Sequence, residues 1–469
     1  MEEKSIFLNE KNGEPALPDV AWVLDELAAK HLSALRGVLT DLPAADIAEL
    51  FLEIPEEKEP LLFRILPKEL AAEVFVDMDT DAQARLLSSF SDLELGEILS
   101  ELYMDDTVDI IEEMPANVVS RMLQSVSPER RRQINELLKY PESSAGSLMT
   151  TEFVRLTAKM TVDEAFSVLR RVALDRETVY TCYVTDDKRH LLGVVTVKTL
   201  LLHKGDTLLS DIMEENVIAV HTLTDREEVT QIFSKYAFLA LPVVDAERRL
   251  VGIITVDDAI DVLKEEVEED FAMMAAVTPT EEPYLRASVF SIFRSRIPWL
   301  LLLMLTATFT GMIISGFEAA LASYVVLTAF IPMIMGTGGN SGSQSSTTVI
   351  RGLSLGEISF RDTVRVLFKE MRVSLLCGVC LAAATFLKVL LLDAYLMGNG
   401  DVTPLVALVV ALTLLVTVVC AKLVGCLLPI LAKKVHLDPA VMASPFITTL
   451  VDTVSLLVYF TVASSMLPL

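Results

Sequence analysis

Long apolar runs fill the C-terminal part of the chain, whereas the N-terminal part carries shorter amphipathic segments. Five of these runs approach the ~20 residues that a helix needs to cross a bilayer: 297–317, 319–339, 373–397, 405–431 and 441–467. If each run crosses once, the basic loops, which contain Arg294, Arg365 and Lys433, all fall on one side. The positive-inside rule then predicts a multi-pass protein of the cell membrane, in contact with lipid, with a cytosolic N-terminal part and the C-terminus outside.

The N-terminal part divides into two patterns. Residues 21–140 alternate short amphipathic helices with Pro or Asp breaks, and helices this short gain stability by stacking into a superhelix. Two similar segments follow, 147–196 and 211–255, and each reads as Met, strand, helix and two strands. We therefore predict a multidomain protein with a flexible tail (1–20), an all-α superhelical N domain (21–140), an α/β tandem pair (141–256), a connecting helix and linker (257–290) and an α-helical membrane domain of five spans (291–469).

Charge separates the two halves of the chain. Residues 1–290 carry a net charge of −29 and residues 291–469 one of +3, within a total of −26. Nucleic acid is excluded as a partner because phosphate binding requires basic surface, whereas carboxylates at this density suit cations. No nucleophile–base pair or closed metal-ligand cluster is evident, so an enzyme is not predicted.

Two of the predicted spans contain polar groups, which are costly in lipid. The second ends in a run with four glycines in seven residues, Gly336 to Gly342, followed by Ser, Gln and Thr. Glycines here either unwind the helix so that carbonyls approach an ion, or allow close helix packing; the polar run to Thr348 favours a pore lining. In the fifth span Ser444, Thr448 and Asp452 share one helix face.

Asp452 is predicted to lie near the bilayer centre, where a carboxylate is a functional candidate. The alternative is a structural ion pair with Lys388 or Lys422. One carboxylate is a weak ligand set for a bare divalent ion, but two of them, supplied by a dimer, suit a largely hydrated Mg²⁺.

Acidic side chains in the N-terminal part are candidates for cation binding. Asp105, Asp106 and Asp109 are assigned to the outer faces of the predicted superhelix, although each is also explained by a solvated face. On the helix that follows the second repeat, one stripe is acidic and another is apolar. The acidic stripe comprises Asp257, Asp261, Glu265 and Glu268, and the apolar stripe comprises Ile260, Leu263, Val267 and Phe271. Like charges at this spacing destabilise a helix, so cation bridging is at least as well supported as a solvated helix.

The repeat resembles a tandem CBS pair. In that family, Gly-apolar-apolar-Thr-x-x-Asp places Thr and Asp on an adenosine ribose, and the second copy has Gly252-Ile-Ile-Thr255-Val-Asp-Asp258. The first copy has Thr199 in place of the Asp. A nucleotide site using Thr255 and Asp258, with ATP as a regulatory ligand, and a purely structural pair both remain open.

The chain as a whole resembles the MgtE family of magnesium channels and transporters. The resemblance rests on Tyr140-Pro-Glu-Ser-Ser-Ala-Gly-Ser-Leu-Met149, Gly336-Thr-Gly-Gly-Asn-Ser-Gly-Ser-Gln344, and Asp438-Pro-Ala with Thr448-Thr-Leu-Val-Asp452. It implies a homodimer whose pore is built from the second and fifth spans, with Mg²⁺ as both substrate and regulator. The implied pore positions are Gly336, Asn340, Ser444, Thr448 and Asp452; at Ser444 the family often has Asn.

The resemblance also implies that the cytosolic domains sense Mg²⁺. Together with Asp452, the expected metal-binding residues are Asp105, Asp106, Asp109, Asp257, Asp261, Glu265, Glu268 and Glu269. We predict a channel that imports Mg²⁺ and closes when cytosolic Mg²⁺ bridges these acidic faces. The alternative is an ion-coupled carrier for Mg²⁺, Co²⁺ or Mn²⁺ with nucleotide-regulated CBS domains.

Overall fold

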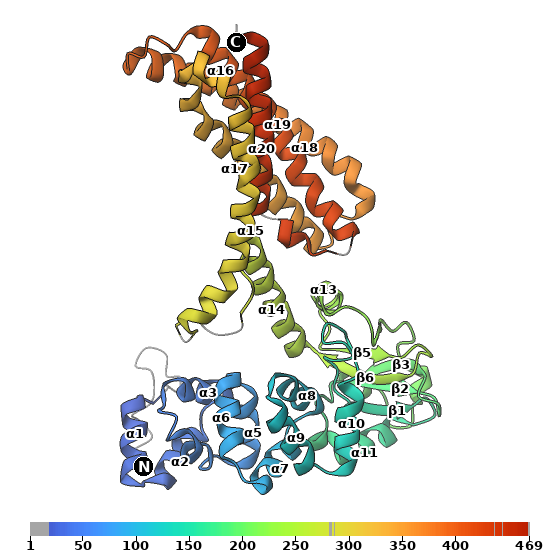
Figure 1. Cartoon of the computed structure of the whole chain (residues 1–469). Helices are drawn as coiled ribbons and strands as arrows, with labels where there is room; N and C mark the ends of the chain where they lie inside the picture. Colours follow the sequence, from blue (N-terminus) through green and yellow to red (C-terminus); the bar gives the residue numbers. More distant parts are fainter. Residues whose placement is uncertain (1–17, 281–283, 286, 436, 443, 468–469) are drawn as a thin grey trace, which may run out of the picture. The chain divides into compact units, whose positions relative to one another are not determined.

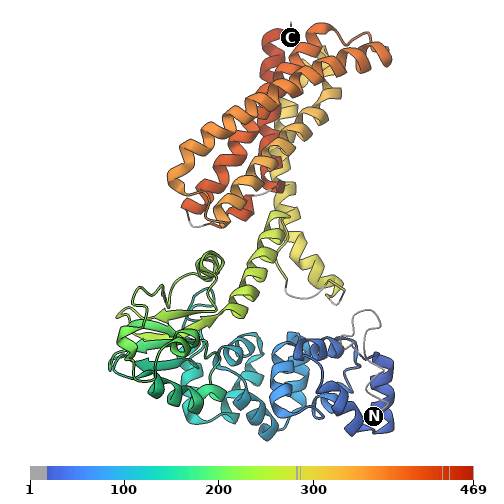
Figure 2. The same ribbon diagram turned by 180° about the vertical axis from the view of Figure 1, so that it is seen from behind.

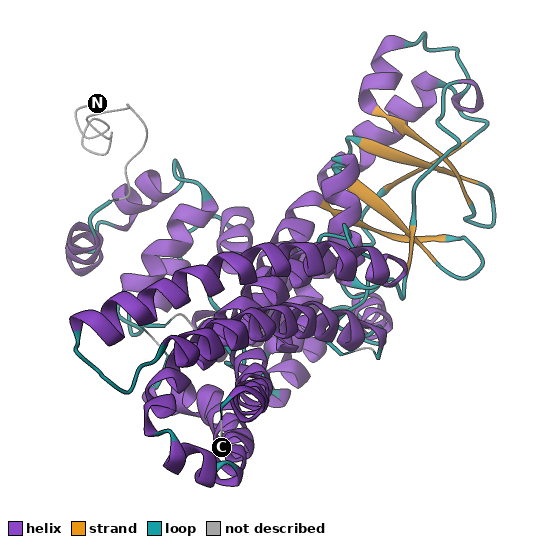
Figure 3. Cartoon of the chain, turned by 90° about the horizontal axis from the view of Figure 1, so that it is seen from above, coloured by secondary structure: helices purple, strands orange, loops and turns teal. Residues whose placement is uncertain are grey.

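The computed structural model describes residues 18–280, 284–285, 287–435, 437–442 and 444–467. The chain divides into two compact units, the first ending at Leu263 and the second beginning at Lys264 (Figures 1 and 2). The described strands, drawn as orange arrows in Figure 3, all lie before Leu263 and so belong to the first unit. Most of the predicted tail, residues 1–17, lies outside the described residues.

Short helices make up the first part of the first unit (blue to teal in Figure 1). They are α1 (Val20–Ala29), α2 (Leu32–Leu39), α3 (Ala44–Glu53), α4 (Glu59–Phe63), α5 (Lys68–Val76), α6 (Thr80–Ser89), α7 (Asp92–Glu101), α8 (Met104–Glu113), α9 (Ala116–Ser125) and α10 (Pro128–Leu137). Helix α3 packs on α5, α5 on α7, and α7 on α9, which is the stacking predicted for this region. The apolar sides meet in one core, where Phe63 contacts the rings of Phe51, Phe75 and Phe90.

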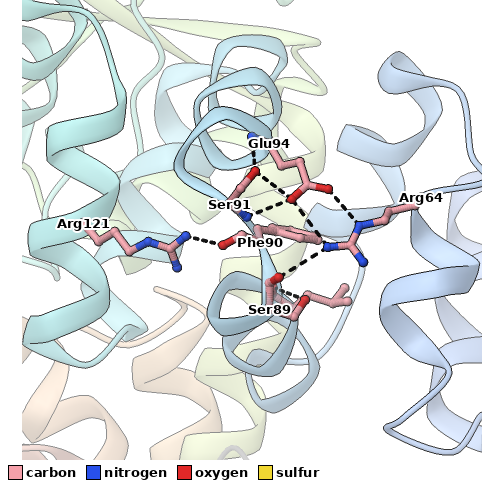
Figure 4. Close-up of polar contacts among 7 residues, drawn as sticks. Arg64, Ser89, Phe90, Ser91, Glu94 and Arg121 are labelled. Carbon is pink, nitrogen blue, oxygen red and sulfur yellow. Dashed lines mark hydrogen bonds and ion pairs between the residues drawn. The ribbon is translucent and has the colours of Figure 1, made fainter.

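Local polar contacts set the ends of these helices. Prolines occupy the N-cap of α3, α5 and α9, and Ser91 closes a capping box with Glu94 at the start of α7. Arg64 Nε donates to Glu94 Oε1 at 2.8 Å, and Arg121 donates to the carbonyl of Phe90 (Figure 4). The hydrogen bonds from Arg64, and then those from Ser91, lower the pKa of Glu94 to about 2. They also tie neighbouring turns of the superhelix together.

Two small sheets with the same topology follow. The strands are β1 (Val154–Thr157), β2 (Thr181–Thr185) and β3 (Leu191–Thr196), then β4 (Val220–His221), β5 (Ala240–Val244) and β6 (Leu250–Thr255). The helices around them are α11 (Val162–Val172), α12 (Val197–Leu202), α13 (Arg226–Tyr236) and α14 (Val256–Met274). In each sheet the first strand is parallel to the second, which is antiparallel to the third. The predicted internal repeat is therefore also a structural repeat.

The methionine that opens each repeat packs on the sheet of the other copy. A Cβ at Gly252 in β6 would lie 2.7 Å from Met149 Sδ, and one at Gly193 in β3 would lie 3.0 Å from Met213 Sδ. Thr150 pairs with Ile253 through backbone hydrogen bonds. Because the methionine of one copy packs directly on the backbone of the other, β3 and β6 each need a glycine at the contact. The same contacts join the two copies into one pair.

The second unit is helical. Its elements are α15 (Val289–Gly316), α16 (Glu318–Ser323), α17 (Ile331–Ser354), α18 (Thr363–Lys388), α19 (Pro404–Lys434) and α20 (Ser444–Met466). Helix α18 continues as a π-helix over Val389–Leu396. Within the described residues, four helical segments are long and apolar enough to cross a membrane: Val289–Gly316, Phe360–Leu396, Pro404–Lys434 and Pro439–Met466. The fold class predicted from the sequence, a helical N domain, an α/β pair and a helical membrane part, is confirmed.

The second predicted span is displaced in the structure. Instead of one helix over 319–339, the short α16 and a 3₁₀ segment, Val325–Phe330, precede α17, which begins at Ile331 and runs through the polar segment to Ser354. Pro332 lies in the first turn of α17, where its missing N–H costs nothing. The apolar run 319–339 therefore covers the short segments before α17 and only the first turns of α17 itself. Helix α17 as a whole is too polar to count among the four apolar segments.

Candidate functional site

One face of α17 is a polar stripe. Asn340, Ser343, Gln344, Thr347 and Thr348 recur at helical spacing and line a shallow hollow of about 550 Å³. Gly336 lies on the same side, and a Cβ there would meet open space. A continuous polar face is unexpected in a membrane helix unless water, an ion or another polar surface covers it.

The opposite face of α17 is closely packed. A Cβ at Gly338 would lie 2.7 Å from Ser455 Oγ, and one at Gly342 would lie 2.9 Å from Ile447 Cγ2. Gly425 of α19 meets the carbonyl of Gly342 directly. The expectation that the glycines unwind the helix is therefore wrong: α17 is continuous, and these glycines serve close packing against α19 and α20.

Helix α20 brings two of the predicted pore residues next to α17. A Cβ at Gly339 would lie 3.0 Å from Thr448 Cγ2, while the Thr448 hydroxyl donates to the carbonyl of Pro445 at 2.9 Å. Asp452, half-buried, lies one turn further along the same face. It is eight residues after Ser444, about 12 Å along the helix at 1.5 Å per residue. The Ser444 side chain lies outside the described part of the structure.

Neither lysine proposed as a structural partner contacts Asp452. Lys388 forms an ion pair with Asp393 at 2.8 Å, and Lys422 donates to Ser345 at 3.4 Å. Within the described residues, no hydrogen bond or ion pair to the Asp452 carboxylate is found. A carboxylate in this position without a structural partner is available to a cation.

A second group of carboxylates gathers in the first unit, where α8 meets the α/β pair. Asp105, Asp106 and Asp109 project from α8, Glu177 precedes β2, and Asp258 lies in the first turn of α14. Asp105 is only 4% exposed, and Glu177 Oε2 is buried without a hydrogen-bond partner. Among the described residues, no three Asp, Glu, His or Cys side chains are close enough together to hold one metal ion. The group is therefore a concentration of negative charge and not a closed ligand cage.

Burial and mutual repulsion raise the pKa values of this group. Burial, then the Asp258 charge, raises the pKa of Asp105 well above its usual value and that of Asp106 to about 6. The pKa of Glu177 rises to about 8 through burial, Asp106 and Asp258. Asp258 reaches about 6, mainly through burial. The side chain of Asp109 is exposed, and the protein that surrounds its carboxyl, followed by the charge of Asp258, raises its pKa as well. The Arg130 guanidinium of α10 interacts with the charge of Asp105, but it does not outweigh the burial and mutual repulsion that raise these pKa values.

The carboxylate of Asp258 is also held by the predicted nucleotide motif. Thr255 Oγ1 donates to Asp258 Oδ2 at 2.5 Å, and the Thr255 amide donates to the same oxygen at 3.3 Å. In the first copy, Thr196 and Thr199 make the equivalent contact between hydroxyls at 2.9 Å. The same carboxylate therefore belongs to the ribose-type motif and to the acidic group.

Both stripes predicted on α14 are exposed. The acidic residues that are exposed are Asp257, Asp261, Glu265 and Glu268, while Glu269 is half-buried. The exposed apolar residues are Ile260, Leu263, Val267 and Phe271, the last with 69% of its surface accessible. An apolar stripe this exposed lacks a partner within the described part of the chain.

Known protein families match most of the chain. Residues 331–462 match the MgtE family, described as divalent cation transporters, and residues 42–143 match the MgtE intracellular N domain. Residues 145–205 and 209–265 each match the CBS domain. The chain is 39% identical over 438 residues to the magnesium transporter MgtE of Thermus thermophilus, covering 92% of this chain and 95% of that protein. The chain belongs to the MgtE family.

Other members support the same assignment. The magnesium transporter MgtE of Bacillus subtilis is 33% identical over 435 residues, covering 92% of this chain and 93% of its own length. The crystal structure of the cytosolic domain of the Mg²⁺ channel MgtE in complex with ATP is 38% identical, covers 52% of this chain and 99% of that one, and superposes with a TM-score of 0.50. The prediction of an MgtE-type transporter in place of an enzyme is confirmed.

Several acidic residues that the sequence did not single out as binding residues lie close to other carboxylates in the structure of this MgtE-family chain. Glu177 joins the α8 group, and the charge of Asp261 contributes to a raised pKa of Asp77, after burial. In the second unit, Ser354 Oγ donates to Asp270 Oδ2 at 3.3 Å, and burial followed by the charge of Asp438 raises the pKa of Asp270. These residues come from separate elements, so no spacing along the chain could have grouped them.

Proposed function

We propose that this protein is a Mg²⁺ transporter in which the ion passes along the polar face of α17 and the Asp452 side of α20. The observation that carries the proposal is a continuous polar stripe on a helix of the membrane unit, beside an unpaired carboxylate on the adjoining helix. Asn340, Thr448 and Asp452 supply oxygen ligands, which suit a hard cation that keeps part of its water shell. Reconstitution into liposomes containing a Mg²⁺ indicator tests the proposal: Mg²⁺ entry is expected, and its absence from folded protein would contradict it.

The pathway requires two copies of the chain. The polar stripe of α17 faces away from α19 and α20 of its own protomer, and one carboxylate is too weak a ligand set for Mg²⁺. In a symmetric homodimer the two stripes face each other and the two Asp452 carboxylates form a pair. The exposed apolar stripe of α14 offers a second surface for the same association.

Helix directions support the proposed orientation in the membrane. Helix α17 contacts α20 through Gly339–Thr448 and Gly342–Ile447, so residue numbers rise along one helix as they fall along the other, and the two helices are antiparallel. Its contacts with α19 rise in number along both helices, so α17 and α19 are parallel. Alternating crossings place the loops with Arg365 and Lys433 on one face. By the positive-inside rule, that face and the N-terminal domains are cytosolic, and the C-terminus is outside.

The acidic group in the first unit is proposed to sense cytosolic Mg²⁺. With α8 packed against the CBS pair, its carboxylates repel one another, and each repulsion favours separation of the N domain. A divalent cation compensates this charge and favours the packed state, which is a population shift caused by differential binding. The packed state is proposed to close the pore.

Protons are expected to mimic Mg²⁺ in this step. In the packed state the pKa of Asp106 is about 6 and that of Glu177 about 8, whereas separated, solvated carboxylates titrate near 4. The packed state therefore binds more protons, so it is favoured by acid and lost as the pH rises through about 6 to 8. Distances between spin labels on exposed faces of α9 and α11, measured without Mg²⁺, should shorten between pH 8 and pH 6.

Two controls accompany this pH experiment. Asp106→Asn with Glu177→Gln should reduce the pH dependence, because the titrating groups are gone. Saturating Mg²⁺ should give the short distance at pH 8 in the unmodified chain. A distance that does not change with pH in the Mg²⁺-free chain would show that repulsion in this group does not drive separation.

ATP is proposed as a regulatory ligand held by Thr255 and Asp258. Because Asp258 lies within the acidic group, an ATP polyanion should bind more tightly in the presence of Mg²⁺. In calorimetry on the full chain, Asp258→Ala should weaken ATP binding about tenfold or more, about 1.4 kcal/mol. The matched change in the first copy, Thr199→Ala, should leave the affinity unchanged. No ATP binding to the unmodified chain would leave the CBS pair as a structural coupler.

A further inference from the structure

A buried lysine connects three helices of the membrane unit. Lys422 of α19 is 5% exposed, and its Nζ donates to Ser345 Oγ of α17 at 3.4 Å. Ser345, 2% exposed, donates in turn to Glu370 Oε2 of α18 at 2.7 Å. The result is a relay from an ammonium through a hydroxyl to a carboxylate, each on a different helix. Charged groups inside a membrane domain are costly and are retained where they have a function.

The relay lies behind the proposed ion pathway. Ser345 follows Asn340 by five residues, which places it about 140° further around α17, away from the polar stripe. It shares this face with Gly342, whose Cβ position would lie 3.2 Å from the carbonyl of Ala421, the residue before Lys422. Lys422 thus reaches α17 where the backbones of α17 and α19 are already in contact, and it does not contact the stripe.

We propose that Lys422 is a positioning residue for Mg²⁺ permeation, which fixes the rotation of α17 about its axis through Ser345 and Glu370. Close glycine packing sets the distance between the helices but supplies no directional hydrogen bond between side chains. The relay adds a directional constraint: the single Ser345 proton points to Glu370, and a lone pair is left for Lys422. Rotation of α17 would move Asn340 and Gln344 relative to Asp452, so the relay sets the ligand geometry. This inference rests on the proposed transport function.

Mg²⁺ flux into proteoliposomes, measured over a range of external Mg²⁺, tests the proposal. Lys422→Met keeps most of the side-chain length and removes the ammonium charge, and it should raise the half-saturating Mg²⁺ concentration about tenfold. Glu370→Gln should act in the same direction, and the double change Lys422→Met with Glu370→Gln should be no worse than either alone, because both act through one relay. The matched control is Lys434→Met, which removes an exposed lysine at the end of α19 whose ammonium lies 4.6 Å from the centroid of the Phe360 ring, and it should leave the half-saturating concentration unchanged.

Rescue separates positioning from simple loss of stability. A hydroxyl can accept from an ammonium and donate to a carboxylate in either direction, so the exchanged pair Lys422→Glu with Glu370→Lys should recover a half-saturating concentration near that of the unmodified chain. Ser345→Ala, which changes no charge, should reproduce the defect even if the charge variants fail to reach the membrane. Wild-type half-saturation in Ser345→Ala, or an exchanged pair that is folded but not rescued, overturns the proposal. Absence of flux from the unmodified chain would instead contradict the transport function.

Discussion

Asp452→Asn should abolish Mg²⁺-dependent growth of a strain that lacks other magnesium uptake. The amide keeps the shape of the side chain but removes its charge, and a hydrated divalent ion in a membrane pathway needs that charge. The structure sharpens this expectation, because Lys388 and Lys422 are engaged elsewhere. Loss of the Asp452 charge would therefore break no ion pair among the described residues, and a folding defect is not expected.

Two companion variants show that the charge is the cause. Asp452→Glu keeps the charge and moves it by one methylene, so partial growth is expected. Asp401→Asn removes an exposed carboxylate from the loop before α19 and should grow normally. Membrane levels of all three proteins must be equal. Normal growth from Asp452→Asn at equal protein levels would remove Asp452 from the ion pathway.

The apolar pattern predicted the membrane helices well where the helices are uniformly apolar. Helices α15, α19 and α20 lie within a few residues of the predicted spans, apart from an early start of α15 at Val289. The predicted bounds of the second span were wrong because hydropathy measures only how apolar the side chains are, whereas the start of a helix also depends on which residues its first turn can accommodate. Pro332 fits the first turn of a helix, and the polar residues that follow are helical because their backbone must be satisfied inside the membrane unit.

The acidic sites could be predicted only in part. Asp105, Asp106 and Asp109 stand close together in the sequence, and the acidic stripe of α14 follows a helical period, so both were found from spacing. Glu177 and the Lys422 relay could not be found this way, because their neighbours come from other elements and lie far apart in the chain. For Lys422 the sequence did give one signal, a lysine inside an apolar run, but it pointed to the wrong partner.

Neutralising the exposed acidic stripe of α14 should leave a transporter that stays active at high cytosolic Mg²⁺. The variant replaces Asp257, Asp261, Glu265 and Glu268 with Ala. The change removes both repulsion, which favours opening, and Mg²⁺ bridges, which favour closing. Because these side chains are exposed, their repulsion is screened over about 8 Å at physiological salt, whereas ion bridges act at contact and depend on the number of ligands. Loss of bridging should therefore dominate.

Patch recordings with varied cytosolic Mg²⁺ measure this effect directly. The α14 variant should need at least about tenfold more Mg²⁺ to close, with unchanged ion preference, because the pathway residues are intact. The matched control removes four exposed carboxylates away from α14: Glu129, Glu136, Asp211 and Glu215. It should close normally, since net charge alone does not set the response. Normal closure of the α14 variant would place the sensing carboxylates in the buried group of Asp105, Asp106 and Glu177. Salt screens the repulsion between buried carboxylates much less, so in that group the repulsion that favours opening would be as important as the Mg²⁺ bridges that favour closing.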